Sequence, residues 1–369
     1  MIENLSIKNF KNLQDLEIQN FGKVNLITGK NNTGKSSLLE AIALYVNDGN
    51  PAELFKILDY REEINLYNLI NRNLNITLEQ YNLNAIASIF TNRLLNSKIH
   101  ITAKEDGILQ NFALRFANYV HEHSTGNNPI TKTIVDDFNP VHPNYLLGLE
   151  TIKGSIHTLY YLSKDLSQQI ASRPIGGTSP ISYQFITSSG NLNHHYSGEL
   201  WDNIILTDKE ISVINALKII EPTVERLAFK SDPLNGRRAV IKLQNIPNVF
   251  PIKSMGDGIN RILHIILAAV NAENGYLLID EFENGLHHSV QEKLWEIIFK
   301  LADELNIQVF ATTHSNDCIY GFEGALNSFK DKEAKGKLIR LERKGDQIKE
   351  VSFTANELRI ATNEDIEIR

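Results

Sequence analysis

The chain contains a single cysteine, Cys318, among its 369 residues. One thiol excludes an internal disulfide framework and a zinc site built from cysteines, and it is typical of a reducing cytoplasm. No apolar run approaches the roughly 18 residues that a membrane-spanning helix needs, and the first residues lack the pattern of a signal peptide. We therefore expect a cytoplasmic protein with no membrane partner.

An excess of basic residues is also missing, because 44 acidic side chains against 37 Lys and Arg give a net charge of −7. This charge excludes a protein-wide positive field that would attract nucleic acid or a membrane surface, although it does not exclude a local basic patch. No heptad pattern is sustained over residues 51–180, so we expect no long coiled-coil arm. The length of 369 residues is sufficient for one large domain or two ordinary ones, and the apolar fraction of 42% supports a substantial core.

A glycine-rich segment at residues 29–36 is the most specific feature that is present. Its sequence, Gly-Lys-Asn-Asn-Thr-Gly-Lys-Ser, matches the complete phosphate-binding pattern G-x-x-x-x-G-K-S/T. The apolar stretch 24–27 before it predicts a buried strand, and residues 37–44 after it predict a helix. A chance glycine turn before a helix is the alternative, and the correct flanks on both sides disfavour it.

This loop supplies the groups that bind a nucleoside triphosphate. Gly29 and Gly34 allow backbone N–H groups to point at phosphate oxygens, and the positive end of the helix adds to the attraction. Lys35 would place its charge on the β- and γ-phosphates, and the Ser36 hydroxyl would reach Mg²⁺. The other expected binding residues of the loop are Asn31, Asn32, Thr33 and Ser37.

A buried strand predicted at 276–279 ends in two acidic residues, which is typical of the second half of a nucleotide site. Asp280 would hold Mg²⁺ directly or through water, and Glu281 would polarise or orient the attacking water. An exposed acidic turn after a core strand is the alternative. The presence of the phosphate-binding loop in the same chain disfavours this alternative.

A second anion site is predicted at the start of the apolar helix 259–270, where Ser254, Gly256 and Gly258 precede or begin the helix. One subunit does not need two phosphate sites for one nucleotide. The second site is explained if it binds the γ-phosphate of a nucleotide held by another subunit. The alternative is a helix cap formed by Ser254 or Asp257.

Two further polar residues are candidates for the same chemistry. His314 follows the buried strand predicted at 307–312, from which it could reach the γ-phosphate. Gln184, in a strand predicted at 181–187, could touch Mg²⁺ or the attacking water. A polar residue in an alternating strand is an equally good explanation of Gln184.

Periodicity predicts the rest of the architecture. Residues 208–229 predict a helix that Pro222 kinks or divides, and residues 121–143 predict an exposed loop. The further strands are predicted at 2–10, 13–18, 98–103, 112–117, 240–243, 338–341 and 348–351. The further helices are predicted at 53–58, 66–74 and 289–305.

Taken together, the motifs resemble those of ABC-type ATPase heads and occur in the same order. The segments that carry the resemblance are 29–36, 254–258, 277–281, 283–287 and 313–315. The Glu-Asn-Gly-Leu-His turn at 283–287 and the opening Ile-Lys-Asn-Phe-Lys at 7–11 resemble the OLD/RecF-like branch, whose members are relatives of SMC proteins.

The resemblance implies an α/β fold with a parallel core sheet that carries the phosphate loop, N-terminal antiparallel strands, and an α+β insertion. Residues 1–46 and 181–369 would form a composite head, and residues 51–180 the variable insertion. It also implies a slow ATPase that binds ATP and Mg²⁺ between two copies of the chain, as a homodimer or a higher even oligomer. Asn284 and Gly285 would then lie at the seam between the copies.

Several departures from the family pattern narrow the expected role. The stretch after His314 is too short for the Toprim nuclease domain of OLD proteins, and the signature is Ser-Met-Gly-Asp-Gly. We expect an ATP-gated module that serves a separate effector protein in DNA maintenance or anti-phage defence. The alternatives are a repair ATPase that binds duplex DNA directly and a slow or non-hydrolysing ATP-gated scaffold. A transporter ATPase is disfavoured by the 283–287 turn.

Overall fold

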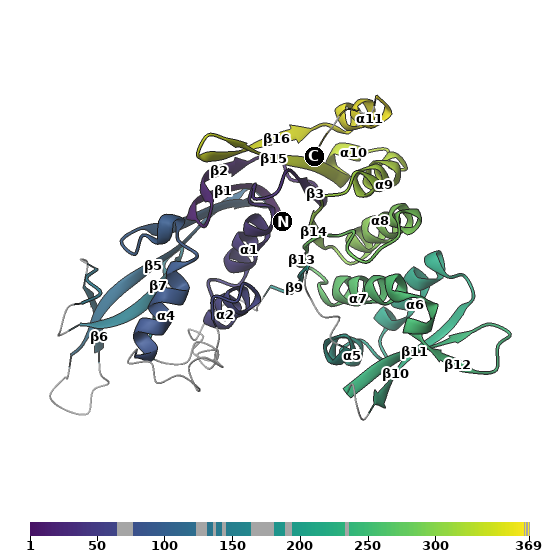
Figure 1. Ribbon diagram of the computed structural model, residues 1–369, viewed down its shortest axis with the longest axis horizontal. Helices are drawn as coiled ribbons and strands as arrows, with labels where there is room; N and C mark the ends of the chain where they lie inside the picture. Colours follow the sequence, from purple (N-terminus) through teal and green to yellow (C-terminus); the bar gives the residue numbers. More distant parts are fainter. Residues whose placement is uncertain are drawn as a thin grey trace.

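The fold is taken from a computed structural model. It describes residues 1–64, 77–122, 131–135, 138–141, 145–163, 181–188, 194–232, 236–364, 366 and 368. The described residues form a six-stranded core sheet, a seven-stranded antiparallel sheet, a three-stranded sheet and the helices that cover them (Figure 1). No described helix combines the length and apolar character that crossing a membrane requires.

The core sheet has the strand order β16-β15-β3-β14-β13-β9. Its parallel strands are β15 (Gly336–Lys344), β3 (Val24–Thr28), β14 (Gln308–Thr312), β13 (Tyr276–Ile279) and β9 (Tyr183–Ile186). The antiparallel β16 (Gln347–Phe353) closes the edge beside β15. Strands β3, β13 and β14 are buried along their whole length, as expected for parallel strands covered on both faces.

Helices cover both faces of the core sheet (Figure 1). One layer holds α1 (Lys35–Val46) and α2 (Pro51–Tyr60), and the other holds α7 (Asp257–Asn271), α8 (His288–Glu304) and α9 (Asn316–Asn327). Side chains alternate between two hydrophobic cores along each strand: Leu277 and Ile279 join the core of α7 and α8, whereas Leu278 joins that of α1. The core sheet is therefore the shared wall of both cores.

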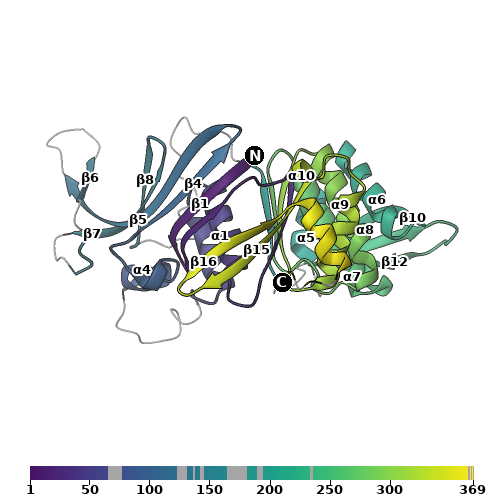
Figure 2. The same cartoon turned by 90° about the horizontal axis from the view of Figure 1, so that it is seen from above.

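The N-terminal hairpin opens the antiparallel sheet, whose order is β2-β1-β4-β5-β7-β8 with β6 beside β5. Its strands are β1 (Ile2–Phe10), β2 (Leu13–Ile18), β4 (Lys98–Glu105), β5 (Ile108–Glu122), β6 (Thr131–Val135), β7 (Leu146–Lys153) and β8 (Ile156–Tyr161). Figure 2 shows this sheet at one end of the molecule and α7 to α9 at the other.

Strands from the segment 51–180 thus continue the sheet that the hairpin begins. Ile101 in β4 lies opposite Ile7 in β1, and both side chains are fully buried in one core. Helix α4 (Leu78–Ala87) is tied to β7, because Leu147 N donates to Glu79 Oε1 at 2.9 Å. The division of the chain into a head and an insertion remains a prediction, but β4 shares backbone hydrogen bonds with β1, and residues of β4, β5 and β7 lie in the same core as β1.

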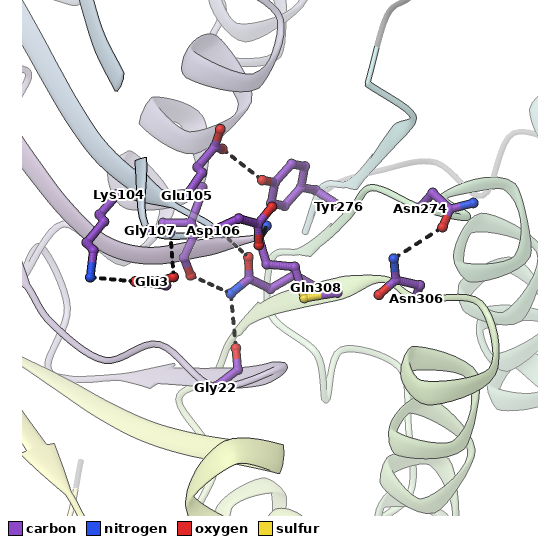
Figure 3. Close-up of polar contacts among 12 residues, drawn as sticks. Glu3, Gly22, Lys104, Glu105, Asp106, Gly107, Asn274, Tyr276, Asn306 and Gln308 are labelled. Atoms are coloured by element: carbon purple, nitrogen blue, oxygen red, sulfur yellow. Dashed lines mark hydrogen bonds and ion pairs between the residues drawn. The ribbon is translucent and has the colours of Figure 1, made fainter. Parts of the chain in front are cut away.

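A buried glutamine joins the two larger sheets where β14 begins (Figure 3). Gln308 is 1% exposed, accepts a hydrogen bond from Ile2 N at 2.8 Å, and donates to the carbonyl oxygens of Ile2 and Gly22. Beside it, the Tyr276 hydroxyl donates to Glu105 at 2.9 Å. Satisfied polar contacts of this kind specify one arrangement of the sheets, because an unpaired buried amide would be costly.

The predicted helix at 208–229 is wrong in its second half. Helix α6 (Asp208–Ile220) ends before Pro222, and β10 (Val224–Asp232) follows and pairs with β11 (Gly236–Leu243). Proline cannot donate the backbone hydrogen bond that a helix interior needs, so it ends the helix. Val224 and Leu227 are spaced as on a helix face, yet they are buried from a strand.

The predicted loop at 121–143 also contains regular structure, since β5 extends to Glu122 and β6 occupies Thr131–Val135. The predicted helix 66–74 lies outside the described residues. The other predicted strands and helices are confirmed. Elements that were not predicted include α5 (His194–Asp202), β12 (Val249–Pro251), α10 (Lys332–Lys335) and α11 (Ala355–Asn363).

Close contact between β9 and β13 requires glycine at position 275. A Cβ there would lie 1.7 Å from the carbonyl oxygen of Ser182, so Gly275→Ala must force the two strands apart. We expect a loss of at least about 2 kcal/mol in the free energy of unfolding, measured with urea. Gly107→Asn is the control, because no atom lies within 4 Å and Asn tolerates its positive φ. Equal stability of the two variants would contradict this packing.

Candidate nucleotide site

The carboxyl ends of three neighbouring parallel strands bring the predicted motifs together. β3 leads into the phosphate loop, β13 into Asp280, and β14 into Thr313 and His314. Ile279 lies opposite Ala311, so Asp280 comes level with Thr312 in the next strand. The register of the core sheet therefore assembles the site from segments that are nearly 300 residues apart.

The phosphate loop has a backbone that only glycine tolerates at its two key positions. Gly29 has φ +140°, and a Cβ there would lie 2.4 Å from the carbonyl oxygen of Leu341 and 2.8 Å from Thr33 Oγ1. Gly34 has φ +88° and immediately precedes α1. Thr33 Oγ1 donates to the carbonyl of Lys30 at 2.8 Å, which closes the loop. The loop is thus shaped before any ligand binds.

Lys35 lies inside this loop and is 6% exposed. Its Nζ donates to the carbonyl oxygens of Gly29 at 2.6 Å and of Lys30 at 3.0 Å. Burial lowers the Lys35 pKa to about 8, and the nearby carboxylates, of which Asp280 is the strongest, act in the opposite direction. The loop carbonyls accept hydrogen bonds from the Lys35 ammonium that phosphate oxygens could accept instead. The loop therefore fits a triphosphate.

Asp280 connects the phosphate loop to β14. It is 3% exposed, and its Oδ1 accepts hydrogen bonds from Ser36 Oγ at 3.0 Å and from Thr312 Oγ1 at 2.6 Å. A hydroxyl and a carboxylate side by side are the oxygen ligands that Mg²⁺ prefers. Ser36 and Asp280 could therefore hold the ion on the phosphate side of the loop.

The backbone at Glu281 is left-handed, with φ +50°, which is uncommon for a residue with a side chain. Two contacts hold it: Glu281 N donates to Thr312 Oγ1 at 2.9 Å, and Arg261 Nη2 donates to the Glu281 carbonyl at 3.4 Å. Glu281 is partly exposed and directly follows Asp280, which could hold Mg²⁺. This position suits an acid that orients a water molecule.

His314 is positioned by an acidic residue, Glu283, which the sequence placed in the 283–287 turn without a role in the nucleotide site. Glu283 accepts hydrogen bonds from His314 N at 2.7 Å and from Thr313 Oγ1 at 2.8 Å. Burial lowers the pKa of the His314 imidazole, and the Lys35 charge adds to this effect. The ring is therefore neutral at pH 7 and can accept a hydrogen bond. Glu283 could have been found as the next acidic residue after Asp280-Glu281, but its role depends on the strand register.

Gln184 is not brought to the phosphate loop in the same way. It lies opposite Leu277, three residues before Asp280, and its amide oxygen accepts a hydrogen bond from the Tyr196 hydroxyl. Together with Tyr60 and Tyr183 it lines a cavity of about 290 Å³. The strand position level with Asp280 belongs to Thr187, because Ile279 pairs with Ile186.

The predicted second anion site lies at the same edge of the core sheet but faces outward. Ser254 is exposed and donates to the Pro251 carbonyl at 2.7 Å, and a Cβ on Gly256 would meet no atom of the described residues within 4 Å. A Cβ on Gly258 would lie 3.4 Å from the Gly285 carbonyl, so the 283–287 turn is its neighbour. Among the described contacts, none joins Ser254, Gly256 or Gly258 to the phosphate loop of the same chain.

Residues 1–319 match the family described as the AAA ATPase domain. The chain belongs to this family. It is 26% identical over 346 residues to an ATP/GTP phosphatase of Helicobacter pylori, and the match covers 86% of each chain. It is also 47% identical over 55 residues to an uncharacterised protein of Methanocaldococcus jannaschii, in a match that covers 15% of this chain and 25% of that one.

Among solved structures, the chain resembles the Smc head crystallised with the C-winged helix domain of ScpA. The TM-score is 0.50 at 13% identity, and the alignment covers 96% of this chain and 97% of that chain. This likeness shows the fold. The predicted ABC-type and SMC-like α/β fold is confirmed, and membership of the ATPase family agrees with a nucleotide-hydrolysing site at the carboxyl edge of the core sheet.

Nucleotide affinity should depend on pH through Lys35. Its pKa of about 8 in the free protein means that the amine is charged below pH 8 and loses its proton above it. A bound triphosphate favours the charged amine, so the affinity for ATP should fall as pH rises above 8, by at most about tenfold per pH unit. Isothermal calorimetry across this range measures the change, with Lys35→Met as a weak and pH-insensitive control. Constant affinity in the unmodified protein would contradict the buried amine.

Proposed function

We propose that the protein is an ATP-hydrolysing head of the OLD/RecF-like class that works as a pair, with each ATP and Mg²⁺ held between two copies. The observation that carries this proposal is that the predicted anion site at Ser254, Gly256 and Gly258 faces outward. It lies at the carboxyl edge of the core sheet, and within the described part of the chain no contact joins it to its own phosphate loop. A head-to-tail pair would place it against the phosphate loop of the partner.

Each copy would contribute distinct chemistry. Backbone N–H groups of the loop and Lys35 would bind the phosphates, while Ser36 and Asp280 would hold Mg²⁺, which neutralises developing charge on the phosphoryl oxygens when bound. Glu281 would accept a hydrogen bond from the attacking water, and the neutral His314 ring would lie at the γ-phosphate. The partner's copy of Ser254 would add its hydroxyl and the N-terminus of α7.

Closure of the pair on ATP and its opening after hydrolysis would then drive a separate effector protein. The relative named as an ATP/GTP phosphatase supports turnover, and the Smc head that was solved with a domain of ScpA supports a protein partner. We place this assembly in the cytoplasm and assign it to DNA maintenance or anti-phage defence. Turnover would be slow, because hydrolysis waits for the two copies to meet.

The acidic residue at position 281 separates binding from turnover. Glu281→Gln should keep the wild-type affinity for ATP, lower turnover at least about 100-fold, and accumulate as an ATP-bound dimer. Calorimetry, phosphate release and light scattering with and without ATP measure the three properties.

Lys35→Ala is the matched control and should remain monomeric, because it cannot hold the nucleotide. Wild-type turnover in Glu281→Gln would show that another group orients the water. A variant that binds ATP tightly but stays monomeric would contradict the proposed pair.

A further inference from the structure

Arg261 is a buried cation that the nucleotide chemistry described above does not use. It is 4% exposed, yet it makes no ion pair within the described part of the chain. Its Nη2 donates instead to two backbone carbonyls, those of Asp280 at 3.3 Å and of Glu281 at 3.4 Å. The guanidinium thus holds the main chain of the two acidic residues to which the proposed function assigns metal binding and hydrolysis.

The position of Arg261 in its helix is equally specific. Helix α7 begins at Asp257, directly after the exposed Gly256, so Arg261 lies about one turn from the outward-facing anion site. The N-terminal end of α7 faces a nucleotide held by the partner, if the proposed pair is correct. The next turn of the same helix touches the acidic pair of its own subunit.

We propose that Arg261 is a positioning residue that couples the two nucleotide sites of the pair: a nucleotide engaged at the start of α7 sets, through Arg261, the placement of Glu281 in the subunit that carries that helix. The coupling rests on the proposed function, because it requires the partner's nucleotide at Ser254–Gly258. The contact with the acidic pair does not require it.

The local geometry gives this coupling a physical basis. Arg261 Nε is buried and has no hydrogen-bond partner among the residues that the structure describes, and the two Nη2 bonds are long. The guanidinium therefore has unused hydrogen-bonding capacity. Glu281, which it holds, has the left-handed backbone of φ +50°. A strained residue beside an incompletely satisfied cation can adopt a second arrangement at small cost, and a shift of α7 would select between the two.

The test compares Arg261→Gln and Arg261→Lys with His264→Gln. His264 lies one turn further along α7, is 7% exposed, and pairs with Ser197 Oγ at 2.9 Å, so its replacement disturbs the packing of the helix without touching the acidic pair. ATP affinity at low protein concentration, turnover and the Hill coefficient are measured for each variant, and thermal melts check folding.

In wild type we expect a Hill coefficient that rises toward about 2, the number of coupled sites. Arg261→Gln should bind ATP within about twofold of wild type but lose at least about tenfold in turnover, with a Hill coefficient near 1. Arg261→Lys keeps a positive charge that can donate to one carbonyl, so it should recover part of the turnover and part of the cooperativity. His264→Gln should retain cooperativity.

Three results would overturn the inference. Cooperative hydrolysis that is unchanged in Arg261→Gln removes the coupling and leaves the proposed pair intact. Equal losses in Arg261→Gln and His264→Gln, without recovery in Arg261→Lys, reduce Arg261 to helix packing. The third result concerns the wild-type protein: turnover per subunit that does not change with protein concentration, together with a Hill coefficient of 1, overturns both the pair and the coupling. In that case a loss of turnover confined to Arg261→Gln would support only the contact with Glu281.

Discussion

The carboxylate of Asp280 is the point on which the site depends. Buried at the end of β13, it accepts the hydroxyl of Ser36 from one side and that of Thr312 from the other. A buried carboxylate is tolerated only when its oxygens are paired, so the phosphate loop, the acidic strand end and β14 must come into register together. The parallel sheet supplies that register, and the two hydrophobic cores on its faces fix it.

Strain and burial are concentrated at the same edge. A left-handed residue such as Glu281 costs on the order of 1–3 kcal/mol, and the surrounding contacts from Thr312 and Arg261 keep it in place. The buried Lys35 ammonium is likewise held by two loop carbonyls. The free site therefore already places charged and polar groups where they would make favourable contacts with phosphate and metal. Such preorganisation favours binding and hydrolysis.

Local patterns predicted much of this arrangement. The loop 29–36 and the strand before Asp280 were recognisable because an apolar run followed by glycines or acids depends on neighbouring residues alone. Pro222 marked the end of α6, but the spacing of Val224 and Leu227 fits a helix as well as a strand, and only the pairing with β11 decides between them.

Contacts that depend on register could not be predicted. Gln184 sits three residues from the carboxyl edge, Glu283 reaches His314, and Arg261 reaches the Asp280 backbone; each of these placements follows from how distant strands and helices align. The continuation of the N-terminal hairpin by β4 has the same origin, because the strand pattern at 98–103 does not name its partner.

The central claim is that a complete site takes the phosphate loop from one copy and the Ser254 segment from another. Mixing two inactive variants, Lys35→Ala and Ser254→Arg, tests it most directly, because a mixed pair contains one intact site and one that lacks both contributions. Random pairing should restore ATPase activity to at most about a quarter of the wild-type rate, since about half of the dimers are mixed and each has one intact site of two. Coupling through Arg261 would lower this fraction further, because the second site of a mixed dimer holds no nucleotide. A mixture as inactive as its components, or full activity of Ser254→Arg alone, would contradict the shared site.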